Sequence, residues 1–272
     1  MLKRTAVIML LAALTAMAGF AQGRVDIQPE VFSTEGVRDA FLFPVTGSVE
    51  GANGTRFRSE ITLVNFRAQD QEVLIEFLEQ GGAAASQHLT LEAGKFYSWD
   101  DFVATVIGRT ERLGALRVRG VYAGTTVTDP AAQLNGFSRI WTPQPNGPGT
   151  SSLSISPIAE NDLTNGDMAA WIFGMRQDEQ YRVNVGIVNL ANYERNFTVD
   201  VRVSSGTDPA PFTIKVPARA LEQVRIPEGT FRTIGIRVTP ELAGAWSAYG
   251  ASVDNQSGDG WVSKAQYPIR QP

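Results

Sequence analysis

The sequence lacks cysteine altogether and has a single histidine, His88, among its 272 residues. Without cysteine the chain forms no disulfide and offers no thiolate to a metal ion. A Ser-His-acid triad would depend entirely on His88, and no Gly-x-Ser-x-Gly motif accompanies it. Phosphate-binding glycine loops and histidine-rich zinc motifs are missing as well. We therefore expect a protein that is not an enzyme, stabilised by buried apolar area alone.

A strong charge of one sign is also missing, because 24 Lys and Arg residues stand against 28 Asp and Glu residues. The arginines are spread along the chain instead of forming a basic run. Binding to nucleic acid needs a basic face that neutralises phosphates. We therefore expect no nucleic-acid partner.

Long hydrophobic runs are absent apart from one at the N-terminus. Lys3 and Arg4 precede an apolar run from Thr5 to Leu14, and small residues follow up to Ala21. This three-part pattern predicts a secretory signal peptide over residues 1–21. The run is shorter than the roughly 20 residues that span a bilayer, so we expect cleavage and no membrane anchor afterwards. The mature chain is then secreted or periplasmic, and the loss of Lys3 and Arg4 takes its net charge from −4 to −6.

The rest of the chain consists of short alternating apolar and polar runs, separated by Gly, Pro, Asn or Asp. Such spacing is typical of β-sandwiches and barrels. Helical periodicity is confined to one stretch that ends at Gly108, with Phe102, Val103 and Val106 on its apolar side and Ser98 or Asp100 as the cap. The sequence predicts an all-β protein with one short helix.

Segments of the two halves of the mature chain match in the same order, which indicates a duplication. The clearest match aligns residues 57–66 (FRSEITLVNF) with 181–190 (YRVNVGIVNL), so that Asn65 corresponds to Asn189. Three further matches follow: 73–77 with 197–201, 116–118 with 236–238, and 136–138 with 250–252. We expect Asn65 and Asn189 to cap the turns that follow their strands.

The boundary between the copies is a turn-rich stretch, residues 142–150, that contains three prolines and two glycines. Each half has about the length of one immunoglobulin domain. We therefore predict two tandem immunoglobulin-like antiparallel β-sandwiches after the signal peptide. The expected divisions are a leader with one added strand (22–37), a first sandwich (38–143), a linker (144–155) and a second sandwich (156–268).

Two motifs of the second half carry a resemblance to a known group. Tyr181-Arg182-x-Asn184-x-Gly186-x-x-Asn189, followed by Asp254-Asn255-x-Ser257-Gly258-Asp259, resembles exported, mostly uncharacterised bacterial proteins built from paired immunoglobulin-like β-sandwich units. The resemblance covers nearly all of the mature chain. It implies a fold and an extracytoplasmic setting but no activity. The first half departs from the pattern, with Glu60 in place of the Asn and Thr62 in place of the Gly.

Exposed aromatic and basic residues are the candidates for ligand binding. Trp141, Trp246 and Trp261 lie beside turn residues, where they could form a platform for sugar rings; the alternative is that they belong to the core. The repeated Arg58 and Arg182 could bind a carboxylate, or could pair with a neighbouring acid at a strand edge.

One loop of the second half is rich in oxygen ligands. Asp254, Asn255 and Asp259 stand around Gly258 and are candidates for binding calcium, the one metal or cofactor that we consider. The loop does not have the spacing of an EF-hand, and a hairpin turn with polar residues explains it equally well.

These observations favour an exported, non-catalytic binding or structural module. We expect it to act in cell-surface or envelope interaction, or in adhesion, with a protein or polysaccharide as its partner. A carbohydrate-binding module that uses the exposed tryptophans is the first alternative. A glycoside hydrolase is the second, with Asp100 and Asp101, or Glu160 and Asp162, as its two carboxylates.

Overall fold

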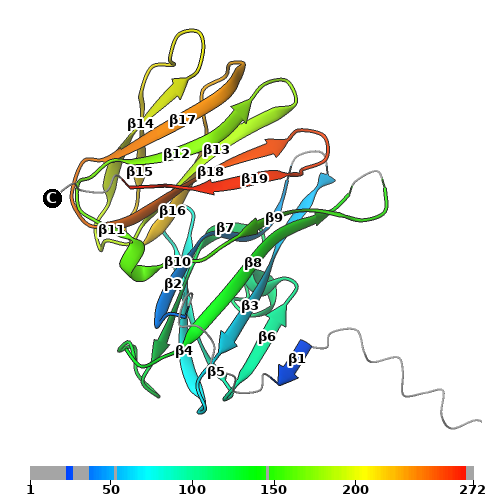
Figure 1. Cartoon of the computed structure of the whole chain (residues 1–272), viewed down its shortest axis with the longest axis vertical. Helices are drawn as coiled ribbons and strands as arrows, with labels where there is room; N and C mark the ends of the chain where they lie inside the picture. The colour runs from blue at the N-terminus through cyan, green and yellow to red at the C-terminus, as the bar shows by residue number, and fades with distance from the viewer. Residues whose placement is uncertain (1–22, 27–36, 52–53, 145–146, 268–272) are drawn as a thin grey trace, which may run out of the picture.

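The computed structural model describes residues 23–26, 37–51, 54–144 and 147–267 (Figure 1). Within them the chain is almost entirely β-structure, and its strands pair antiparallel, so the predicted all-β class is confirmed. The predicted signal peptide, residues 1–21, lies outside the described residues. Over the described part of the chain, no helix combines the length and the apolar character needed to cross a membrane.

The first half forms one continuous hydrogen-bonded sheet that folds over at the hairpin between β2 and β3, giving two layers. Sheet I has the order β9 (Thr150–Ile155), β8 (Leu134–Pro143), β3 (Arg56–Asn65), β6 (Lys95–Trp99) and β1 (Gly23–Asp26). Sheet II has the order β10 (Ile158–Ala159), β2 (Ala40–Glu50), β7 (Arg112–Val121), β4 (Gln71–Glu79) and β5 (Ala84–Leu91).

The second half forms two further sheets. Sheet III has the order β18 (Ala245–Asp254), β13 (Tyr181–Asn189) and β16 (Ala220–Arg225), with β11 (Thr164–Asn165) and β19 (Gly260–Lys264) on the outer side of β18. Sheet IV has the order β12 (Ala170–Gln177), β17 (Phe231–Pro240), β14 (Arg195–Val203) and β15 (Phe212–Val216).

The strand order of the first half is repeated in the second. Sheet I (β9-β8-β3-β6) corresponds to sheet III (β19-β18-β13-β16), and sheet II (β2-β7-β4-β5) corresponds to sheet IV (β12-β17-β14-β15). One predicted match, that of residues 136–138 with 250–252, is wrong by two residues. Ser138 lies opposite Ile61, whereas Gly250 lies opposite Val185, the counterpart of Ile61. A shift of two keeps every side chain on the same face of a strand, so the sequence pattern does not reveal it.

Three hydrophobic clusters hold the four sheets in a stack. One lies between sheets I and II and includes Phe41, Ile75 and Leu116, and another lies between sheets III and IV. The third joins the halves, with Leu42, Leu78 and Ala115 from sheet II, Val188, Leu221 and Tyr249 from sheet III, and Ile158 and Leu163 from the connection. In Figure 1 the second half accordingly lies directly on the first.

The connections differ from the prediction in two places. Part of the expected linker, Thr150–Ile155, is strand β9, which pairs with β8. The helix α1 (Phe102–Thr105) forms as predicted, with Phe102 and Val103 buried, but its cap is Asp101, which accepts a hydrogen bond from Ala104 N at 3.3 Å. In the expected leader, β1 pairs with β6 as the added strand, and residues 27–36 lie outside the described residues.

Candidate functional site

The outer face of sheet IV, which points away from the first half, carries two neighbouring aromatic side chains. Trp171 and Phe173 are two residues apart on β12, so they lie on the same face. Their ring planes are parallel to within 2°, with the centroids 5.8 Å apart. A Cβ atom at Gly235, on the neighbouring β17, would lie 3.7 Å from both rings. Phe173 is 50% exposed, so this apolar surface is open to solvent.

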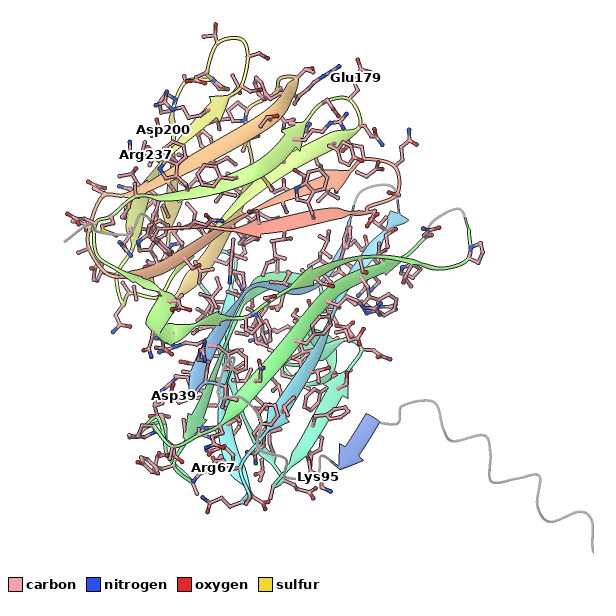
Figure 2. The ribbon with its side chains drawn as sticks, viewed as in Figure 1. Asp39, Arg67, Lys95, Glu179, Asp200 and Arg237 are labelled. Carbon is pink, nitrogen blue, oxygen red and sulfur yellow. The ribbon has the colours of Figure 1, made fainter. Side chains whose placement is uncertain are left out.

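A charged pair lies next to these rings on the same face. Arg237 is directly opposite Trp171 on one side and opposite Asp200 of β14 on the other. Figure 2 shows Asp200 and Arg237 next to each other. Arg237 Nη1 and Asp200 Oδ2 are 4.0 Å apart, and Arg202 Nη2 is 3.8 Å from Asp200 Oδ1. These separations are longer than a hydrogen bond. The side chain of Arg237 is 44% exposed and can bind further polar atoms, whereas that of Asp200 is 13% exposed.

For Trp246 the alternative holds that it belongs to the core, so Trp246 as a ligand candidate is corrected. Its side chain is fully buried between sheets III and IV, with its ring centroid 5.3 Å from that of Phe197 and 5.7 Å from that of Tyr267. Trp246 is opposite Asn189 in the ladder of β13 and β18, on the inward face of its strand. A turn residue nearby in sequence therefore does not indicate an exposed side chain here.

Two of the predicted ligand residues contact each other on the outer face of sheet I. The guanidinium of Arg58 lies over the Trp141 ring, 5.1 Å from its centroid, and Trp141 Nε1 donates to Asp100 O at 3.0 Å. Arg58 Nε is also 3.9 Å from Asp101. A cation over an aromatic face stabilises the pair. One face of the Trp141 ring is thus occupied by Arg58.

Trp261 and Arg182 lie in sheet III. Trp261 is 37% exposed and its Nε1 donates to Gly174 O at 2.8 Å, which ties β19 to β12. Arg182 donates to Asn255 Oδ1 at 3.1 Å. Burial, together with the nearby Arg225, lowers the pKa of Arg182. Of the five predicted ligand residues, Trp261 has the largest exposed aromatic surface, but it does not share a face with Trp141.

The loop considered for calcium closes the hairpin between β18 and β19. Asp254 Oδ1 accepts from the backbone N–H groups of Gln256 and Ser257, both at 2.8 Å, and its Oδ2 accepts from Gln180 Nε2 at 3.1 Å. The hydrogen bond from Ser257 N is the main cause that lowers the pKa of Asp254. Gly258, at φ +74°, packs against Phe57 of the first half. The geometry supports the hairpin-turn alternative for Asp254, Asn255 and Asp259, since Asp254 is engaged by N–H donors.

Acidic groups elsewhere are held by donors in a similar way. Asp101 caps α1 and accepts from Ser48 Oγ at 2.9 Å, and Glu160 is paired with Arg117. Across the described part of the chain, no group of three or more His, Cys, Asp or Glu side chains is placed to hold a metal ion. Burial raises the pKa of Glu222.

A free strand edge is the other accessible feature. β5 ends sheet II, and over the described ranges no strand pairs with its second edge. Its eight residues, AASQHLTL, include no lysine or proline, two residues that commonly protect edge strands from pairing. His88 points outward from β5, with Nδ1 2.5 Å from Glu72 Oε1.

No family model matches this chain, and no curated protein matches it. The functional conclusion therefore depends on the geometry of the described residues.

Proposed function

We propose that this chain is an exported, non-catalytic binding protein that acts at the cell surface or in the envelope, secreted or periplasmic. The observation that carries the proposal is the four-sheet stack, in which a third hydrophobic cluster fixes the two halves to each other. Such a stack is a rigid frame that leaves two outer sheet faces and the β5 edge open to partners.

The finer part of the proposal is that the frame consists of two copies of one immunoglobulin-like sandwich. The equal strand orders support it, as do the central pairs β3-β6 and β7-β4, which match the B-E and F-C pairs of immunoglobulin domains. The first and last strands, however, are exchanged between the two sheets relative to an immunoglobulin domain. The first strand, β2, pairs with β7, and the seventh, β8, pairs with β3, so the unit is a variant of the immunoglobulin order.

The state of the ionisable groups supports binding over hydrolysis. A glycosidase needs two carboxyl groups that are free to act on the sugar on either side of the bond that is cleaved. Asp101 and Glu160 instead hold structural contacts, and His88 lies on an exposed strand beside Glu72. The inferred resemblance to exported bacterial proteins agrees with such a role but assigns no partner.

The proposal is tested by retention. Protein secreted by cells that express the full chain is passed over insoluble polysaccharides and washed cell-envelope fractions, with a heat-unfolded sample as the control. We expect the folded protein to be retained by at least one fraction and the unfolded sample not to be. Absence of retention, or release of reducing sugars from a retained polysaccharide, would contradict a non-catalytic binding role.

A second candidate function, capture of a protein by strand addition, is favoured by the open β5 edge. A partner strand that pairs with β5 would form main-chain hydrogen bonds along eight residues. The variants Ser86→Lys and Gln87→Lys place charges on this edge, and Thr213→Lys places one on β15, the corresponding edge of the second half. Loss of envelope-protein capture in the β5 variants alone would support this candidate, and equal capture by all variants would exclude it.

A further inference from the structure

Corresponding sheet faces of the two halves differ in their exposure to solvent. The outer face of sheet II is buried under the second half around Leu42, Leu78 and Ala115, and the corresponding outer face of sheet IV is open. The strand registers align Leu42, Leu78 and Leu113 of sheet II with Trp171, Arg202 and Thr233 of sheet IV, respectively. Two of the three leucine positions are thus polar on the open face, where no second unit covers them.

The aromatic pair does not follow this trend. Phe173 is 50% exposed and Trp171 is partly buried, and together they form an apolar surface within a polar face. Arg202 and Thr233 of the same face are polar, so the aromatic pair stands out as an apolar patch, and exposed apolar patches with a polar rim are one mark of a binding surface.

The size of the patch selects the kind of ligand. A stable protein interface buries about 800 Å² on each partner, whereas one aromatic side chain supplies about 150–250 Å². Two partly exposed rings amount by themselves to only part of such an interface. They fit a ring-shaped ligand that has one apolar face and a polar rim, which describes a sugar in its chair form.

The polar groups beside the rings fit the rim of such a ligand. Arg237, with a side chain that is 44% exposed, supplies N–H donors, and Asp200, 13% exposed and 4.0 Å away, supplies acceptor oxygens. Arg237 is the cross-strand neighbour of Trp171, so these groups border the rings. Small-molecule sites commonly combine apolar contact with a few polar groups that fix orientation.

We propose that the outer face of sheet IV binds a polysaccharide, with sugar rings packed against Trp171 and Phe173 and their hydroxyls bound by Asp200 and Arg237. This inference rests on the proposed binding function and names its ligand class and site. The site differs from the tryptophans that the sequence suggested, since Trp246 is buried and one face of Trp141 is covered by Arg58.

Affinity gel electrophoresis tests the inference. The secreted protein migrates through gels that contain soluble β-glucan, xylan, galactomannan or solubilised peptidoglycan. We expect at least one of them to retard it, and the variants Trp171→Ala and Phe173→Leu to bind about tenfold more weakly. Phe173→Tyr keeps an aromatic ring and is expected to bind like the wild type. Phe137→Ala, at a residue 45% exposed on sheet I, is the matched control, and thermal unfolding verifies that each variant is folded.

Each outcome decides the inference. Retardation that is lost in Trp171→Ala and Phe173→Leu but kept in Phe173→Tyr and Phe137→Ala supports it. Equal retardation of all variants, or retardation by none of the polysaccharides, overturns it. If the gel experiment fails but envelope fractions retain the protein, the proposed binding function stands without this site. If no envelope fraction retains the protein either, the binding function and the site are both excluded.

Discussion

Asn65 and Asn189 form the same hydrogen bonds at corresponding points of the two halves. Asn65 is fully buried, and its Nδ2 donates to the carbonyls of Gln69, Leu91 and Glu92 at 2.9, 3.0 and 3.2 Å, respectively. Asn189, also fully buried, donates to those of Tyr193, Val216 and Pro217 at 2.8, 3.3 and 2.9 Å, respectively. Each Oδ1 accepts from the backbone N–H two residues later. The prediction that both residues cap turns is confirmed.

Replacement of either asparagine should destabilise the protein to a similar degree. Asn65→Ala and Asn189→Ala each leave buried carbonyl groups without a donor, which costs about 1–3 kcal/mol of the free energy of unfolding. Denaturant unfolding measures the change. Asn196→Ala, at an exposed residue of β14, is the control and should change stability by no more than about 0.5 kcal/mol. A loss of stability in only one of the two variants, Asn65→Ala or Asn189→Ala, would contradict the equivalence of the turns.

Glu76 should contribute more to stability than Asp200, although the two occupy corresponding positions. Glu76 Oε2 lies 3.2 Å from Arg117 and 3.1 Å from Arg119, and the residue also pairs with Arg219 of the second half. Glu76→Gln removes the charge partner of Arg119 and Arg219, while Arg117 keeps Glu160, and we expect a loss of about 3 kcal/mol.

The matched variant is Asp200→Asn, because the ion pairs of Asp200 are 3.8 and 4.0 Å long. We expect it to cost less than about 1 kcal/mol. The two variants are compared by thermal and denaturant unfolding at the same pH. Equal losses in both would show that the contact between the halves does not depend on Glu76.

Trp246→Ala should be far more destabilising than Trp261→Ala. Truncation of a fully buried Trp removes a large apolar side chain from the second core, at about 3–5 kcal/mol. Trp261 is 37% exposed, so its loss should cost clearly less. Denaturant midpoints and polysaccharide retardation are measured together. Loss of retardation in a folded Trp246 variant would contradict its place in the core.

The loop of Asp254 should make stability depend on acid pH. The hydrogen bond from Ser257 N, with that from Gln256 N, lowers the folded-state pKa of Asp254 below its unfolded value of about 3.9. The stabilisation is therefore complete above that unfolded pKa and is lost as the pH falls through the folded pKa. Asp254→Asn should remove this part of the acid sensitivity, which unfolding from pH 6 down to about pH 2 measures.

Calcium provides the converse test for the same loop. Because N–H donors already engage the Asp254 carboxylate, we expect millimolar calcium to leave the Tm unchanged. A rise of several degrees that Asp254→Asn abolishes would contradict the hairpin-turn description and restore the calcium site.

Much of the fold could be predicted from the sequence because strands with one solvent face alternate in polarity. The match of residues 57–66 with 181–190 identified two corresponding strands, and Asn65 with Asn189 identified their turns. The stacking of the two halves was not predicted. Its signal is the continuous apolar run Ala40–Val45, in which Phe41 faces one cluster and Leu42 another. Such runs are typical of strands buried on both faces.

The candidate site was harder to predict, because exposure of an aromatic residue depends on which sheet covers it. Trp246 and Trp171 both lie on strands, but only the three-dimensional order of the sheets shows that the first points inward. The available signal was the spacing of Trp171 and Phe173, which places both on one face of a strand. Arg237 and Asp200 meet there only through strand pairing between distant segments.

The central claim, that the folded protein binds its partner through the outer face of sheet IV, is tested most directly by hydroxyl-radical footprinting. The protein is oxidised alone and in the presence of a polysaccharide that retards it, and oxidation is mapped by mass spectrometry. The account predicts that Phe173 and Trp171 become protected on binding while Phe137 and Tyr122, both exposed elsewhere, remain equally reactive. Protection at Phe137 with no change at Phe173 would contradict it.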